Sequence, residues 1–156
     1  MASGKLHTLA TAAATVPTAV VTGAVTGDVG LAALAGLGCA SGVFLSPDLD
    51  VDGRSESELI LWRAAVPLGV AFTLAWGPYA VLLRHRSPLS HLPVLGTLLR
   101  VGYLALWAAL VQLHLRAVGL PLDLFWWTRY PQGTLAWVAG LAVSDLGHWV
   151  LDGFPA

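Results

Sequence analysis

The chain has 156 residues, of which 56% are hydrophobic and 11% are charged, and its formal net charge at pH 7 is -1. A soluble domain carries about 25% charged residues, so this chain has too few to cover a soluble surface, and we expect an integral membrane protein. The charge balance gives no sign of nucleic-acid binding, and a single cysteine, Cys39, excludes an intrachain disulfide. The length fits one helical membrane domain over residues 1–156.

Five apolar stretches follow one another, at residues 8–25, 29–45, 59–83, 93–118 and 133–151. Each is close to the length of about 17–25 residues that an α-helix needs to cross a bilayer. The first carries threonines at spacings of three and four, which we attribute to helix packing in preference to a polar wall. The second is rich in small residues, which allow helices to approach closely in lipid.

The stretch at 59–83 differs from the others because it contains Pro67, Gly69, Gly77 and Pro78. Proline and glycine break or kink helices, and a membrane tolerates them only where the freed backbone groups find partners. The pattern is compatible with one kinked span, or with two short helices that enter and leave on the same side.

Ionisable residues gather at the ends of these stretches. Imidazole and carboxylate groups are the usual ligands of zinc and similar divalent ions. Helix ends that meet in space would therefore build a metal site. The four clusters are His7; Asp48 and Asp50; Arg84, His85, Arg86 and His91; and Asp145, His148 and Asp152.

The last cluster is the most informative. Asp145, His148 and Asp152 stand at i, i+3 and i+7, which places all three on one face of a helix. That helix is otherwise apolar, and ionisable groups on it are costly to bury unless something pairs with them. A metal ion would do so, whereas a capped helix end with a buried histidine is the competing interpretation.

The other clusters also have two interpretations each. Asp48 and Asp50 are either ligands or part of a solvated acidic loop. Arg84 and Arg86 either hold an anion or anchor the chain at the membrane surface. Arg100, about two turns into the fourth stretch, either faces the site or extends its head group to the interface.

The clusters can meet in only one of two topologies. If all five stretches span the membrane, His7 and Asp48 lie about 30 Å from His91 and His148. If 59–83 is instead a broken segment, re-entrant or interfacial, the chain crosses four times and every cluster falls on one side. The basic residues favour this version, with Lys5, Arg54, Arg63, Arg84 and Arg86 on the ligand side and Arg116 and Arg129 opposite. By the positive-inside rule the ligand side is then cytoplasmic.

We therefore predict an all-α bundle integral to the inner (cytoplasmic) membrane, with four spanning helices plus the broken segment at 59–83. The order of motifs resembles an uncharacterised bacterial family of metal-binding membrane proteins, and is similar to the LexA-regulated inner-membrane metal-dependent hydrolases. The motifs are His7, Ser46-Pro47-Asp48-Leu49-Asp50, His85-Arg86-Ser87-Pro88-Leu89-Ser90-His91 and Asp145-Leu146-Gly147-His148 through Asp152. The resemblance spans nearly the whole chain, although the stretch at 59–76 is more apolar than expected of that family. It implies hydrolysis, and metal binding at His7, Asp48, Asp50, His85, His91, Asp145, His148 and Asp152.

The leading functional hypothesis is a metal-dependent hydrolase that uses one or two divalent ions, with zinc favoured by ligand type. Asp50 or Asp145 would serve as general base if it is not a ligand, and Arg84, Arg86 or Arg100 would hold a phosphoryl oxygen. The expected partners are membrane lipids and a phosphoester or lipid-linked substrate. A non-catalytic metal-binding protein, acting as a sensor, a chaperone or a structural site, is the alternative. The oligomeric state is left open.

Overall fold

The computed structural model describes residues 3–50, 55–83 and 87–153. Within these ranges every regular element is helical and no strand occurs, so the all-α prediction is confirmed. The elements are α1 (Gly4–Thr26), α2 (Val29–Ser41), the 3-10 helix η1 (Pro47–Asp50), α3 (Glu56–Ala64), α4 (Val66–Leu82), α5 (Pro88–His91), α6 (Pro93–Ala117), the 3-10 helix η2 (Trp126–Arg129) and α7 (Pro131–Leu151).

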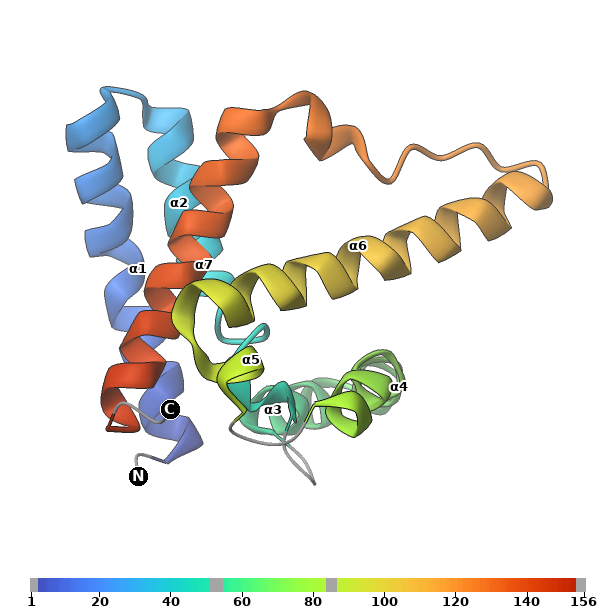
Figure 1. Ribbon diagram of the computed structural model, residues 1–156, viewed down its shortest axis with the longest axis horizontal. Coiled ribbons are helices and arrows are strands. Elements are labelled where there is room, and N and C mark those ends of the chain that lie inside the picture. The colour runs from blue at the N-terminus through green and yellow to red at the C-terminus, as the bar shows by residue number, and fades with distance from the viewer. Residues whose placement is uncertain (1–2, 51–54, 84–86, 154–156) are drawn as a thin grey trace.

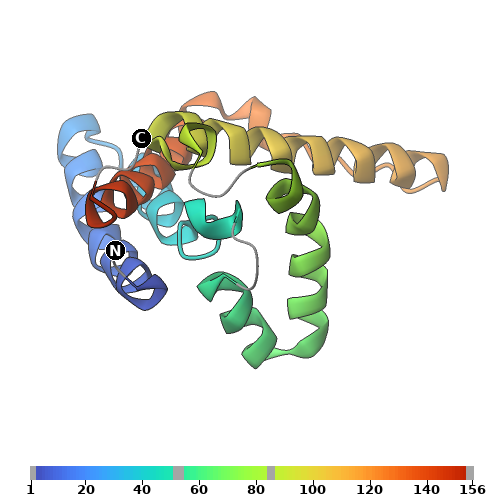
Figure 2. The same ribbon diagram turned by 60° about the horizontal axis from the view of Figure 1, so that its bottom comes forward.

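Helices α1, α2 and α7 run side by side as a bundle, and α2 packs against both of the others (Figure 1). The start of α1 and the end of α7 lie at the same end of this bundle. Helix α6 leaves the bundle at a steep inclination, while α3 and α4 lie below it (Figures 1 and 2). The chain thus brings its two ends together and leaves α6 reaching outward.

Glycines set the spacing between α2 and α7. A Cβ atom on Gly38 would lie 1.9 Å from the carbonyl oxygen of Trp137, and one on Gly140 would lie 1.9 Å from that of Ala35. The two backbones therefore touch, which is the close packing that the small residues of α2 predict.

This contact gives a test of the packing. Gly140→Ala should destabilise the protein by about 1–3 kcal/mol, because the added methyl overlaps the backbone of α2. Gly147→Ala on the same helix is the matched control, since its methyl would meet nothing within 4 Å. That control should be neutral or stabilising by up to about 1 kcal/mol, because alanine favours helix. Thermal unfolding followed by circular dichroism measures both, and equal behaviour of the two variants would contradict the close contact.

In the described part of the chain, three helices are long and apolar enough to cross a membrane, namely α1, α6 and α7, with 23, 25 and 21 residues. The remaining predicted span, at residues 29–45, does not form a helix long enough to cross a membrane. Its helix α2 has 13 residues, about 20 Å at 1.5 Å per residue. The chain turns after Ser41 and enters η1, which ends the helix early.

The predicted break within 59–83 is present. Helix α3 ends at Ala64, Ala65 is extended with φ -163° and ψ 132°, and α4 begins at Val66 with Pro67 in its first turn. Proline is accepted there because the first helical N–H groups have no partner within the helix. Gly77 and Pro78 do not interrupt α4. The segment is thus two helices joined at one extended residue.

Candidate metal centre

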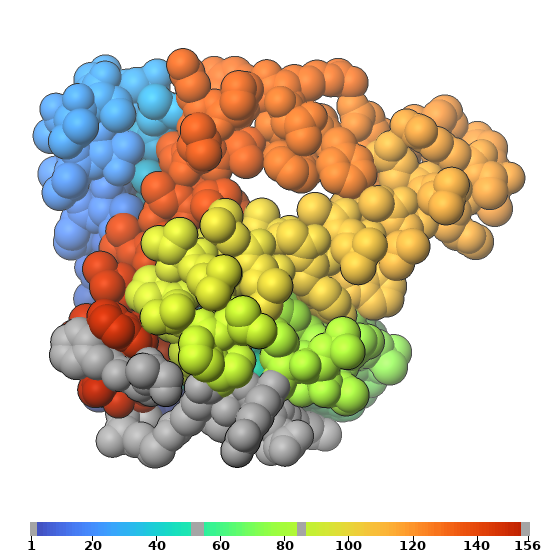
Figure 3. All heavy atoms as spheres, viewed as in Figure 1, coloured from blue at the N-terminus to red at the C-terminus, as the bar shows by residue number. Residues whose placement is uncertain are grey.

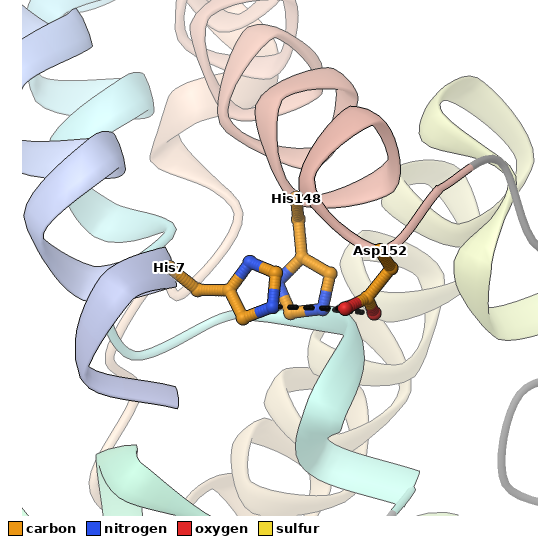
Figure 4. Close-up of side chains that lie close together, drawn as sticks. All are labelled: His7, His148 and Asp152. Carbon is orange, nitrogen blue, oxygen red and sulfur yellow. Dashed lines mark hydrogen bonds and ion pairs between the residues drawn. The ribbon is translucent and has the colours of Figure 1, made fainter. Parts of the chain in front are cut away.

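Of the residues that the structure describes, five side chains of ligand type meet where α1 begins and α7 ends. They form two groups that share His148, and within each group one ligand atom of every residue lies within 4.8 Å of the others. The first group is His7, His148 and Asp152 (Figure 4), and the second is Asp48, His91 and His148. Four segments far apart in the sequence supply them, namely α1, η1, α5 and the end of α7.

The two imidazoles from α1 and α7 are stacked. The rings of His7 and His148 have centroids 3.7 Å apart and planes 13° apart. Nε2 of His7 lies 3.1 Å from Oδ1 of Asp152, and Nε2 of His148 lies 3.4 Å from Oδ2 of the same carboxylate. Both rings therefore present a nitrogen to Asp152, as Figure 4 shows.

His148 also faces η1, because its Nε2 lies 3.4 Å from Oδ1 of Asp48. The side chain of His148 is buried, and among the described residues its Nε2 makes no well-directed hydrogen bond. A buried polar atom left in this state costs free energy unless another partner binds it. An atom that faces two carboxylates without a hydrogen bond fits a bound cation.

A small cavity adjoins this point. It has a volume of about 10 Å³, and its walls include His7, Asp48 and His148. That is close to the space that one water molecule needs. The site therefore has room for a single small ligand beside the imidazoles.

The Asp48 carboxyl is the most accessible of the site, with 25% of its side chain exposed. Burial by itself raises its pKa, but the interaction with His148 and the charges of His148, His7 and His91 outweigh that effect and hold the pKa below its ordinary value. Asp48 is consequently ionised at neutral pH, which is the form that ligates metals.

Asp50 lies behind His91. Ser90 donates its hydroxyl to Oδ2 of Asp50 at 2.5 Å, and its oxygen lies 2.9 Å from Nδ1 of His91. A hydroxyl has one proton, so in this arrangement Ser90 accepts a hydrogen bond from Nδ1–H. The neutral ring then carries its lone pair on Nε2, which is the usual way that a hydrogen bond prepares a histidine ligand. Asp50 is thus placed to support His91.

Asp145 lies one turn before His148 but is not part of either group. It forms an ion pair with Arg100 and accepts a hydrogen bond from Thr97. The guanidinium of Arg100 is fully buried and also donates to the carbonyl oxygen of Ser90 at 3.0 Å. Arg100 therefore links α6 to α5 and α7, and its head group does not reach a surface where substrate could bind.

Three residues of the predicted site, Arg84, His85 and Arg86, lie outside the described residues. Two residues that the sequence did not single out contribute to the arrangement. Ser90 directly precedes His91, and Thr97 stands one helical turn before Arg100. Those spacings are signals that could have indicated them, although the carboxylates that they bind, Asp50 and Asp145, come from other segments.

The family model described as "Uncharacterized metal-binding protein (DUF2227)" matches residues 2–156. No curated protein and no solved structure matches the chain. The family description gives metal binding but names no ligand and no activity.

Proposed function

Because the chain belongs to this family of uncharacterized metal-binding proteins, we propose that it holds one divalent metal ion at the centre described above. The ligands would be His7, Asp48, His91, His148 and Asp152. The observation that carries the proposal is the buried Nε2 of His148, which faces two carboxylates without a well-directed hydrogen bond. The nitrogen and oxygen donors suit zinc, which is the first ion to test.

One ion fits better than two. The two groups of ligands share His148, and its Nε2 faces both Asp48 and Asp152. A neutral imidazole nitrogen has a single lone pair, so it can coordinate one ion at a time. The two groups therefore describe two halves of one site.

The protein is proposed to reside in the inner membrane with this centre at the cytoplasmic end. Helices α1, α6 and α7 supply the apolar length, and many of their large side chains are exposed, such as Val20, Val25 and Leu113. Lys5 lies near the centre, while Arg129 precedes the opposite end of α7. That distribution of charge supports the cytoplasmic placement.

The proposed activity is hydrolysis of a phosphoester, with a lipid-linked substrate favoured by the membrane setting. A bound divalent ion would supply Lewis acidity and would lower the pKa of a water molecule to about 7. The cavity beside His7 and His148 has room for that water. The two predicted general bases, Asp50 and Asp145, are both held by internal partners, so neither is well placed to accept the proton of that water.

A non-catalytic role as sensor, chaperone or structural site is the second candidate. The observation in its favour is burial, since His7, His91 and His148 are exposed by only 6%, 1% and 4%. A closed site of that kind is typical of a structural metal.

Metal content and turnover together test these proposals. The protein purified in detergent should contain about one zinc ion per chain by inductively coupled plasma mass spectrometry. Removing that ion with a chelator should lower the unfolding temperature, since an ion at 100 times its Kd stabilises the native state by about 2.7 kcal/mol. Turnover on a panel of phosphomonoesters, phosphodiesters and phospholipids should be lost with the ion and restored with zinc.

The possible results separate the candidates. One ion per chain without turnover of any substrate would favour the non-catalytic role. Failure to retain zinc, manganese, iron(II), cobalt or nickel would overturn the metal centre itself.

A further inference from the structure

A second cavity lies away from the metal centre, between α6, α7 and the connector that carries η2. Its volume is about 410 Å³, within the range typical of small-molecule sites. Helix α6 contributes Leu104, Ala105 and Ala108 to its walls, and η2 contributes Trp126 and Trp127. Figure 3 shows the molecule hollowed where these three segments enclose space.

The walls offer almost nothing to a polar ligand. The indole N–H of Trp127 donates to the carbonyl oxygen of Leu124 at 3.1 Å. The hydroxyl of Thr134 lies 2.8 Å from the carbonyl oxygen of Trp127, to which it donates. Among the residues that the structure describes, no charged side chain lines the cavity, and most of the remaining wall is aliphatic or aromatic. The preferred occupant is therefore a hydrocarbon.

We propose that this cavity binds one acyl chain of a membrane lipid. Two of its walls, α6 and α7, are candidate spanning helices, which would place it beside the hydrocarbon of a bilayer. Trp126 and Tyr130 stand at the cavity with 67% and 65% of their surface exposed. Such aromatic side chains prefer the level of the lipid head groups. They would hold the head-group end of the lipid while its chain occupies the apolar interior.

The shape of the cavity favours a chain over a helix of a partner protein. A helix that docks in a groove recognises its partner over several turns, each about 5.4 Å long. An acyl chain is thin and flexible enough to follow the space between α6 and the connector.

Neighbouring alanines on α6 provide a matched test. Ala108 is half-buried and lines the cavity, whereas Ala109 is exposed and does not. The Ala108→Trp variant should fill the cavity, while Ala109→Trp adds the same side chain to the outer surface of the same helix. Delipidated protein in detergent is mixed with dioleoyl phosphatidylglycerol or, separately, with oleate, and native mass spectrometry counts the bound molecules.

Wild type and Ala109→Trp should each retain one lipid molecule per chain, and Ala108→Trp should retain at least ten-fold less lipid. Retention of phosphatidylglycerol alone would identify a membrane lipid as the source of the chain, and equal retention of oleate would show that the chain suffices. Equal retention in Ala108→Trp, or no stoichiometric binding of either probe, would overturn the proposal. The proposal would also be overturned if the wild type were a dimer, Ala108→Trp were a monomer, and both retained the same amount of lipid. A second copy of the chain would then occupy the cavity.

The metal content of each tryptophan variant reports whether the variant is correctly folded. Val138, the lining residue of α7 closest in sequence to His148, precedes it by ten residues, about 15 Å along the helix. Metal content should therefore match wild type in both tryptophan variants. Ala105→Phe, a smaller change on the same wall, replaces Ala108→Trp if the latter loses its metal or its helical circular dichroism. The lipid site does not depend on the metal centre, so failure of one leaves the other standing.

Discussion

His148→Ala should abolish metal binding more completely than any other single substitution. Its Nε2 belongs to both groups of ligands, and it connects Asp48 on η1 with Asp152 at the end of α7. Removing a group that only supports a ligand commonly costs 10–100-fold in affinity, about 1.4–2.7 kcal/mol. The loss of this ligand should exceed about 100-fold, so that the purified variant retains less than a tenth of the wild-type metal.

The matched control is His114→Ala. His114 lies in the last turn of α6, is exposed, and belongs to neither group. Its replacement should leave metal content and affinity at the wild-type values. Zinc affinity by competition with a chromogenic chelator measures both variants. His148→Asn, which keeps a polar group in the same place, serves if the alanine variant is unstable. Full metal retention in both His148 variants would show that the ion is held elsewhere or not at all.

Asp145→Ala should cause the largest loss of stability. Arg100 and Asp145 are exposed by 0% and 1%, and each is the other's charged partner. Removing one member of a buried ion pair leaves the other charge uncompensated, which typically costs about 3–5 kcal/mol. Thr97 would lose its carboxylate acceptor as well. We expect a loss of that size in unfolding by sodium dodecyl sulfate from mixed micelles.

An exposed ion pair of the same chemistry is the control. The side chains of Arg129 and Asp123 are 78% and 41% exposed, and a pair at such a surface is worth about 0–1 kcal/mol. Arg129→Ala should therefore be nearly neutral. The double variant Arg100→Leu with Asp145→Leu should recover much of the stability, because it leaves no lone charge. A loss below about 1 kcal/mol in Asp145→Ala would contradict the buried pair.

The Asp145→Ala variant also distinguishes a structural role of Asp145 from a role as metal ligand. The sequence places it on the helix face that carries His148, and the motif it shares with His148 resembles a set of ligands. The structure instead gives it Arg100 as a partner. If the ion pair with Arg100 is only structural, the Asp145→Ala variant should keep its zinc affinity within about ten-fold of wild type. The affinity is measured under mild conditions in which the variant remains folded. A loss comparable to that of His148→Ala would restore Asp145 as a ligand.

Periodicity and composition were enough to predict much of the architecture. The apolar stretches at 93–118 and 133–151 correspond closely to α6 and α7, because a long apolar run has few alternatives to a helix. The proline at position 67 indicated the break that occurs at Ala65. The length of α2 could not be read in this way, because the residues after Ser41 are still apolar and only the turn toward η1 ends the helix.

The sequence by itself determined which residue types stand at the helix ends, and therefore that His7, Asp48, His91 and His148 are available as ligands. The tertiary structure decided which of them meet. Asp145 and Asp152 are alike in sequence, being carboxylates on one face of one helix with His148 between them. They differ because α6 presents Arg100 to the first, whereas α1 presents His7 to the second. Side-chain partners across helices depend on how the helices are placed, and no local pattern in α7 carries that information.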